Sequence, residues 1–129
     1  MPPRGAGLER LRLPPRRRLR RKSDYEVTYA RGRRLGDGFF AIVACPNDAG
    51  GARLGLAVAR KATGDAVQRN RVRRVIRETF RLRQHDLPSV DIVVSARAGI
   101  RKARNAELRA SLNTLWDRVK DQCASLPRS

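Results

Sequence analysis

The sequence predicts a single small α+β domain, with helices packed on a small mixed sheet in the order α-β-β-α-β-α. Three observations support this prediction. Two long stretches, at about 66–84 and 104–123, repeat apolar residues with the helical period. Three short apolar runs, at 38–45, 53–60 and 90–97, have strand character and are separated by turn residues. The length of 129 residues suits one modest hydrophobic core.

The N-terminal part differs in composition from the rest. Residues 1 to about 21 contain four of the seven prolines and many arginines, so we expect a disordered basic arm. The domain then occupies residues 22–124 and is followed by a short tail at 125–129. Its first helix is expected over residues 24–31 and ends at Gly32.

The first helix and the first two strands carry local signals. Ser23 stands at the N-cap position of the helix, with Glu26 at the capping-box position. The strands at 38–45 and 53–60 are joined by PNDAGGA, a segment of dense turn chemistry. We therefore expect these two strands to form an antiparallel hairpin. Asp65 is expected to cap the next helix.

The last helix has a continuous apolar stripe. Its members fall at i, i+4, i+7, i+8, i+11 and i+15, namely Leu108, Leu112, Leu115, Trp116, Val119 and Cys123. Such a stripe is typical of a core face, so Trp116 is predicted to be buried. The two cysteines, Cys45 and Cys123, lie in apolar contexts without metal-ligand spacing, which favours buried, reduced thiols.

The charge indicates an anionic partner. Thirty Lys and Arg residues oppose twelve Asp and Glu residues, a formal charge of +18, which fits nucleic acid, an anionic membrane or an acidic protein. Arginine far outnumbers lysine. This bias suits phosphate binding, but a GC-rich genome, which favours arginine codons, would explain it equally well. No run approaches a transmembrane helix or signal peptide, so we expect a soluble cytoplasmic protein.

The stretch VQRNRVRRVIRETFRLRQ, at 67–84, contains seven arginines. At 100° per residue, one arc holds its apolar side chains and Thr79: Val72, Val75, Ile76, Thr79, Phe80 and Leu82. The opposite arc holds Arg71, Arg73, Arg74, Arg77 and Arg81, with Glu78 as the one acid. The alternative is an ordinary solvated face, but like charges at i, i+4 repel. A polyanion would relieve that repulsion, and the helix start favours phosphate.

Four segments together resemble one known family. RNRVRRVIRETFR resembles the Arg-Asn-Arg signature helix of the bacterial ribonuclease P protein subunit. RLGLAVARKATGDAVQRNR is similar to its strand-loop-helix, SDYEVTYARGRRL to its first helix, and DIVVSARAG to the next strand. The resemblance covers about residues 20–120. A lone RNR triplet would carry almost no weight, whereas the signature helix in this context is highly specific.

The resemblance implies a division of labour between protein and RNA. In that family an RNA is the catalyst, binds Mg²⁺ and removes the 5′ leader of precursor tRNA. The protein binds this RNA, which we expect in a 1:1 complex, and holds the leader in a cleft beside the sheet. The resemblance also implies the fold of the second domain of the fifth small-subunit ribosomal protein, with a left-handed βαβ crossover that opposes the usual right-handed rule.

The resemblance also assigns roles to particular residues. Binding of the catalytic RNA is expected for the signature positions and the adjacent arginine, which are Arg69, Asn70, Arg71, Arg73, Arg74, Arg77 and Arg81. Arg60 and Lys61 match the family's basic pair, which implies that they bind RNA through its backbone. Tyr25 and Tyr29 match positions that face the leader cleft, although both rings could equally pack on the sheet. Phe40 matches an apolar position beside the cleft, so it is expected to bind the leader with the two tyrosines, and Val43 stands where an aromatic can occur.

Other functions find less support in the sequence. A protein-only nuclease needs clustered carboxylates or paired histidines, yet His85 is the one histidine and the aspartates are scattered near turns. A DNA regulator needs mixed polar groups for base reading, which this uniform arginine arc lacks. A structural RNA-binding protein of ribosomal type remains the alternative. We therefore expect RNA partners, no membrane or DNA partner, and no metal site in the protein.

Overall fold

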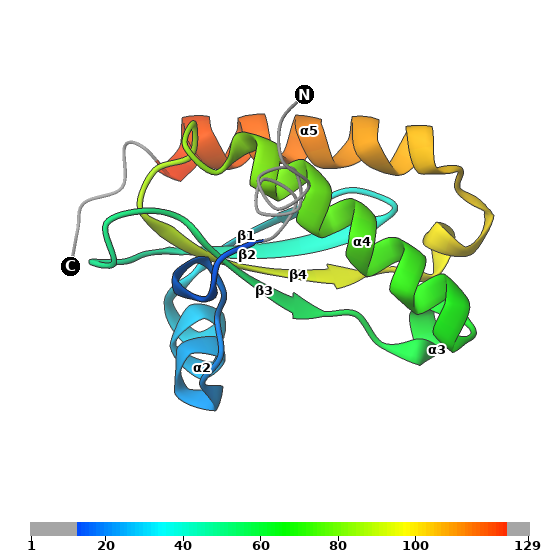
Figure 1. Cartoon of the computed structure of the whole chain (residues 1–129), viewed down its shortest axis with the longest axis horizontal. Coiled ribbons are helices and arrows are strands. Elements are labelled where there is room, and N and C mark those ends of the chain that lie inside the picture. Colours follow the sequence, from blue (N-terminus) through cyan, green and yellow to red (C-terminus); the bar gives the residue numbers. More distant parts are fainter. Residues whose placement is uncertain (1–12, 124–129) are drawn as a thin grey trace, which may run out of the picture.

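A computed structural model describes residues 13–123 of the chain (Figure 1). Its elements follow one another as η1 (Pro15–Arg17), α2 (Lys22–Arg31), β1 (Arg33–Gly36), β2 (Phe40–Pro46), β3 (Arg53–Ala57), α3 (Arg60–Thr63), α4 (Ala66–Arg83), β4 (Val90–Ala96), η2 (Ala98–Lys102) and α5 (Asn105–Cys123). The predicted α+β class and the main helices and strands are confirmed. The structure adds the strand β1 and the short helix α3.

The sheet has four strands in the order β1-β2-β4-β3. β2 is antiparallel to both β1 and β4, whereas β3 is parallel to β4. The predicted hairpin between β2 and β3 is therefore wrong, because β4 lies between them. Five of the seven residues of β4 are buried, as expected for a central strand that is covered on both faces. The link from β3 to β4 contains α3 and α4, which gives the length that a parallel crossover needs.

The true hairpin joins β1 to β2. The Oδ1 atom of Asp37 accepts hydrogen bonds from the backbone N–H groups of Phe39 and Phe40, both at 2.9 Å. Its other carboxylate oxygen accepts a hydrogen bond from the hydroxyl of Ser111. Burial alone would raise the pKa of Asp37, but these hydrogen bonds lower it below its ordinary value. This turn therefore ties the hairpin to α5.

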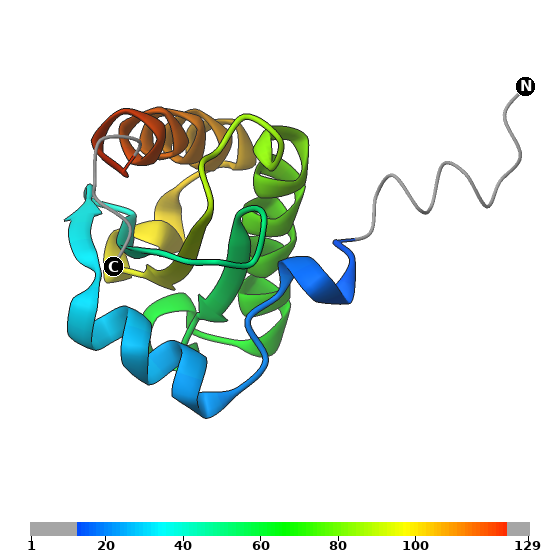
Figure 2. The same ribbon diagram turned by 90° about the vertical axis from the view of Figure 1, so that its left-hand side faces the viewer.

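Helices cover both faces of the sheet. Figures 1 and 2 show α4 and α5 on one face and α2 on the other. Side chains alternate along a strand, so the even-numbered residues of β2, β3 and β4 pack beneath α4 and α5, together with Leu35 of β1. This core contains Phe40, Ile42, Leu54, Ile92, Val94, Val72, Val75, Ile76, Phe80, Leu108, Leu112, Leu115, Trp116 and Val119.

Several helix details differ from the sequence predictions. α2 begins at Lys22, and its N-cap is Arg21 without a side-chain cap, so Ser23 is not the cap. Glu26 forms an ion pair with Lys22 at 3.8 Å instead of a capping box. Leu82 is 74% exposed rather than buried, because it lies at the edge of the apolar arc. The cap by Asp65 is confirmed, since its carboxylate accepts the N–H of Gln68 at 2.8 Å.

The N-terminal segment is also ordered further than predicted. Residues 13–21 lie against the domain, with Leu13 and Leu19 only 4% and 5% exposed. The prediction of a disordered arm is wrong for residues 13–21, which pack against the domain that was expected to begin at residue 22. Residues 1–12 and the predicted tail at 125–129 lie outside the described residues. The two buried leucines explain the difference, because they give a basic segment an apolar anchor.

α4 and α5 are joined by a buried polar contact. Trp116 is fully buried, and its ring lies edge-on to Phe80 with centroids 5.7 Å apart. The indole N–H of Trp116 donates to the hydroxyl of Thr79 at 3.1 Å. That hydroxyl donates in turn to the carbonyl of Ile76 at 3.1 Å. A tryptophan can therefore be buried here without an unsatisfied donor.

The change Thr79→Val keeps the side-chain shape but removes the acceptor for the Trp116 indole. We expect a loss of about 1–3 kcal/mol in the free energy of unfolding, because a buried donor loses its partner. Urea denaturation followed by tryptophan fluorescence measures this loss. The control is Thr114→Val in α5, where the exposed hydroxyl bonds to Ala110, and a change of about 0.5 kcal/mol or less is expected. Equal losses in both variants would contradict the role of Thr79.

Candidate nucleic-acid interface

α4 is held so that its arginines face outward. Its N-terminus is capped by Asp65, and the preceding Gly64 has φ 100°, a conformation that favours glycine. Its apolar stripe lies in the core, where Val72, Ile76 and Phe80 are 0% exposed. Fixing one face of a helix fixes the direction of the other. The outward direction of Arg73, Arg74 and Arg77 is therefore set by the packing of the opposite face in the core.

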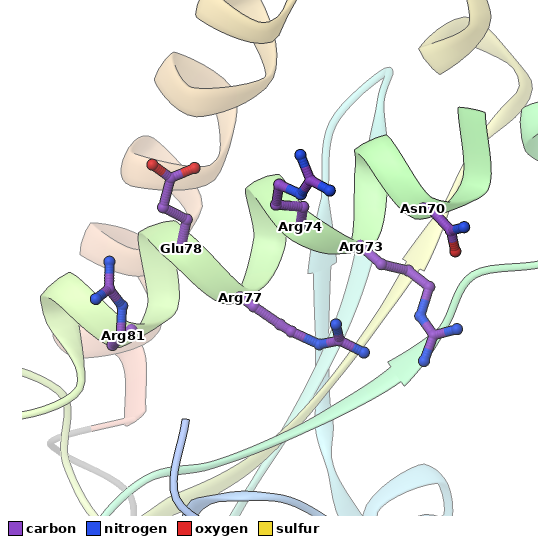
Figure 3. A pocket seen from close by; sticks show the side chains of 6 residues that line it. All are labelled: Asn70, Arg73, Arg74, Arg77, Glu78 and Arg81. Carbon is purple, nitrogen blue, oxygen red and sulfur yellow. The ribbon is translucent and has the colours of Figure 1, made fainter. Parts of the chain in front are cut away.

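The outward face of α4 carries a groove of about 490 Å³. Figure 3 shows its lining residues on the helix. Arg73 and Arg77 extend from one side of α4 toward β3, whereas Arg74 and Glu78 extend from the other side. The full lining is Asn70, Arg73, Arg74, Arg77, Glu78 and Arg81. Five of the seven RNA-binding positions predicted on this helix thus line one surface, which we call the α4 groove.

The other two predicted positions on α4 are engaged within the protein. The Nε of Arg69 donates to the carbonyl of Val58 at 2.8 Å, which ties α4 to the end of β3. One Nη of Arg71 donates to Asn105 at 2.7 Å and to the carbonyl of Ala103 at 3.2 Å. The sequence predicted the same RNA-binding role for Arg69 and Arg71 as for the other arginines. In the structure, both form hydrogen bonds that position the helix.

The remaining arginine of the stretch is likewise structural. Arg83 forms ion pairs with Asp117 and Asp86, and Lys120 also pairs with Asp86 at 2.8 Å. These contacts link the C-terminal end of α4 to α5. The arginines of this helix therefore divide into a group that holds the fold and a group that faces the α4 groove.

The α4 groove is electrostatically unbalanced. Burial lowers the pKa of Arg77 below its ordinary value, and the charges of Arg73 and Arg18 lower it further. Glu78, the one acid in the lining, forms an ion pair with Arg109 of α5 at 3.4 Å. The Nε of Arg73 is buried without a hydrogen-bond partner in the described part of the chain. The arrangement suits a polyanionic ligand.

The predicted basic pair lies at the other end of α4. Arg60 and Lys61 open α3 and are both exposed. The guanidinium of Arg101, in η2, donates to the carbonyls of Lys61 and Ala62. This contact braces α3 and leaves both basic side chains at the surface. The structure does not bring the pair into the α4 groove.

A second surface lies on the α2 side of the sheet. A shallow groove of about 330 Å³ is lined there by Tyr29, Val43, Arg34, Arg97, Leu35, Gly36, Ala41, Ile42 and Ser95. Tyr29 is 39% exposed. Partial burial and the neighbouring Tyr25 raise the pKa of Tyr29, while Arg34 lowers it. We call this surface the Tyr29 groove. Sequence reasoning identified Tyr29 and Val43 but missed Arg34 and Arg97, which carry no motif.

Tyr25 and Phe40 do not line the Tyr29 groove. The hydroxyl of Tyr25 accepts the N–H of Leu56 at 3.2 Å and donates to the carbonyl of Leu19 at 3.4 Å. Its ring lies over Gly55, where a Cβ would be 2.9 Å from the ring carbons. Phe40 is 0% exposed in the core beneath α4 and α5. Its ring cannot stack on a ligand there, which contradicts the predicted leader-binding role. The alternation of the strand turns Ala41 and Val43 toward the α2 side instead.

The carboxylates near these surfaces are engaged with protein groups. Arg53 binds Asp91 through two hydrogen bonds of 2.7 Å and lies 3.9 Å from Asp24. Asp37 holds the β1–β2 turn. Among residues 13–123, no three His, Cys, Asp or Glu side chains gather where they could hold a metal ion. The described helices also include none that is long and apolar enough to cross a membrane.

Comparisons with known proteins agree with this architecture. Residues 13–120 match the family described as Ribonuclease P. The "Ribonuclease P protein component" of Thioalkalivibrio sulfidiphilus is 40% identical over 108 residues, covering 84% of this chain and 90% of that protein. The protein of the same name from Marinobacter nauticus is 44% identical over 118 residues, covering 88% and 86%.

A solved structure gives the same result. The RNase P protein of Staphylococcus aureus superposes with a TM-score of 0.75 at 28% sequence identity, covering 81% of this chain and 95% of that one. The family match spans most of the chain and includes the segment from Leu13 that the sequence analysis had placed outside the domain. This chain therefore belongs to the ribonuclease P protein family.

Proposed function

We propose that this protein binds a catalytic RNA through the α4 groove and holds the 5′ leader of precursor tRNA in the Tyr29 groove. It thereby assists the Mg²⁺-dependent removal of the leader. The observation that carries this proposal is the division of the α4 arginines. Those engaged within the fold leave Arg73, Arg74 and Arg77 without an ion pair in the described part of the chain, on one continuous face.

Guanidinium groups in this arrangement are suited to phosphates rather than to bases. A guanidinium binds two phosphate oxygens at once through parallel N–H bonds. The α4 groove contains one amide, Asn70, and lacks the mixture of polar and apolar groups that base reading requires. Binding is therefore expected to depend on RNA shape and backbone position, which is the usual mode for folded RNA.

The Tyr29 groove has the properties of a single-strand site. Its floor is formed by the small residues Gly36, Ala41 and Ser95, so a flat base can approach the sheet. The Tyr29 ring offers a stacking surface, and Arg34 and Arg97 supply positive charge beside it. Val43 lines the groove as an apolar side chain without a second ring. This combination favours an unpaired strand with little preference for sequence.

The chemistry is assigned to the RNA. Glu78 forms an ion pair with Arg109, and Asp37 accepts hydrogen bonds from Ser111 and from backbone N–H groups, so these two carboxylates beside the grooves are already engaged within the protein. The ion is therefore proposed to be held mainly by the RNA subunit, in a 1:1 complex in the cytoplasm. The protein supplies binding and orientation.

Reconstitution tests the proposal as a whole. The purified protein alone is expected to leave precursor tRNA uncut, and to lower the Mg²⁺ concentration that the catalytic RNA needs for cleavage. Cleavage is followed with end-labelled precursor across a Mg²⁺ titration. Cleavage without RNA would overturn the assignment of chemistry. Binding without any help at low Mg²⁺ would favour the alternative, a structural RNA-binding protein with no role in cleavage.

The division of the arginines is tested by Arg74→Ala against Arg83→Ala. Arg74 is exposed and lines the α4 groove, so its loss should weaken binding of the catalytic RNA and flatten the salt dependence by about 0.9 log units per lost phosphate contact. The melting temperature of the Arg74→Ala variant should be unchanged. Arg83→Ala breaks ion pairs to α5 and should lower the melting temperature while keeping the salt slope. The reverse pattern would show that the division is wrong.

Leader binding is tested by Tyr29→Ala against Val27→Ala, an exposed residue on another side of α2. Losing one stacked base costs about 1–3 kcal/mol, so the holoenzyme should bind leader-bearing precursor more weakly by that amount. Its affinity for mature tRNA should be unchanged, because mature tRNA has no leader. Equal losses for both RNAs, or an equal effect of Val27→Ala, would remove Tyr29 from the leader site.

A further inference from the structure

A separate cavity lies where the N-terminal segment meets α4. Leu19 donates its backbone N–H to the carbonyl of Leu54 at 2.8 Å, and Arg18 forms a parallel bridge with the same residue. Residues 18 and 19 therefore lie along the outer edge of β3. Figure 2 shows this segment, in dark blue, passing beside α4 before it enters α2. Sequence reasoning gave this segment no structure and no role.

The backbone of this segment decides where its side chains point. Leu19 packs near Gly55 and Tyr25 on the α2 side, since a Cβ on Gly55 would be 2.9 Å from its Cδ1 atom. In extended chain, successive side chains alternate between the two sides. The side chains of Arg18 and Arg20 therefore point away from that of Leu19, and all three residues line the cavity beside α4.

The cavity gathers four arginines. It has a volume of about 260 Å³ and is lined by Arg18 and Arg20 of the segment together with Arg73 and Arg77 of α4. Tyr25 and the side chains of Leu54 and Leu56 complete most of the wall. No carboxylate is among its lining residues. None of the four arginines forms an ion pair within residues 13–123.

Three of these arginines, Arg18, Arg73 and Arg77, are close enough for their charges to interact, and no carboxylate in the cavity lining offsets these charges. The charges of Arg73 and Arg18 both act on Arg77, after burial, to lower its pKa. Arg73 also has a buried Nε without a hydrogen-bond partner in the described residues. Elsewhere on α4, Arg69, Arg71 and Arg83 have protein acceptors. Arginines gathered around an apolar floor repel one another. An anion placed between them would be attracted by each of them and would offset that repulsion.

We propose that this cavity binds a backbone phosphodiester of RNA, coordinated by Arg18, Arg20, Arg73 and Arg77. The inference rests on the proposed function and adds a site to it. A strand is favoured over a free nucleotide because the cavity shares Arg73 and Arg77 with the α4 groove. It also reaches Tyr25 of α2. An RNA backbone that follows α4 can therefore continue across this cavity toward the α2 side of the sheet.

The phosphate can come from the catalytic RNA or from the precursor, and two binding assays distinguish them. The variant is Arg18→Ala, and the control is Arg16→Ala, an exposed arginine of the same segment that does not line the cavity. In the first assay, protein binds the catalytic RNA over a salt series. In the second, the assembled holoenzyme binds precursor or mature tRNA over the same series.

Arg18→Ala should flatten the salt slope by about 0.7 to 0.9 log units in one assay, with a smaller effect of Arg16→Ala. A change in the first assay assigns the phosphate to the catalytic RNA. A change in the second, for leader-bearing precursor alone, assigns it to the leader. Unchanged slopes in both assays, or equal effects of the two variants, would overturn the proposal.

Two further variants keep the outcome interpretable. Arg18→Lys keeps the charge and should retain the salt slope, while losing part of the affinity because lysine cannot form the two-pronged contact. Combining Arg18→Ala with Arg77→Ala should cost less than the sum of the single changes if both bind one phosphate. Strict additivity would overturn the shared site. If Arg74→Ala weakens RNA binding and Arg18→Ala does not, the phosphate site proposed for this cavity is wrong and the proposed function stands.

Discussion

The burial of one face of α4 is the constraint on which the rest of the structure depends. Its apolar stripe joins the sheet to α5, and the Thr79 and Trp116 pair fixes the angle between the two helices. A helix with seven arginines in one stretch would not be stable from its own side-chain contacts, because like charges on it repel. Core packing supplies the stability that the exposed face lacks. The fold therefore tolerates a concentration of charge that local interactions alone would oppose.

The helices could be predicted closely from the sequence, because periodicity and capping are local signals. α4 and α5 begin and end within one residue of the expected bounds, and Asp65 caps as its position indicates. Strand pairing is a property of the whole sheet, and local patterns did not reveal it. Nothing in the turn after β2 shows that β4 will enter between β2 and β3. The short strand β1 was not recognised, because three of its four residues are arginine or glycine.

The candidate site was predicted in outline but not in detail. Helical geometry placed Arg73, Arg74 and Arg77 on one face, as the structure shows. It could not show that Arg69 and Arg71 find acceptors on other elements, since Val58 and Asn105 are distant in sequence. The resemblance pointed to Phe40, but strand alternation turns that ring into the core. Leu13 and Leu19 carried the signal for the N-terminal segment, obscured by the surrounding arginines and prolines.

The central position of β4 has a consequence for the order in which this protein forms during synthesis. β4 is the last strand to leave the ribosome, yet it is the strand that both β2 and β3 pair with. Until about residue 96 has emerged, β3 has no partner strand and the β1–β2 hairpin stands alone, and such a hairpin is marginal in water. The N-terminal segment also takes its final place only after β3 has paired, because it packs along the outer edge of β3. Residues 13–21, although synthesised early, thus reach their final places late, and the basic surfaces come together as one late event.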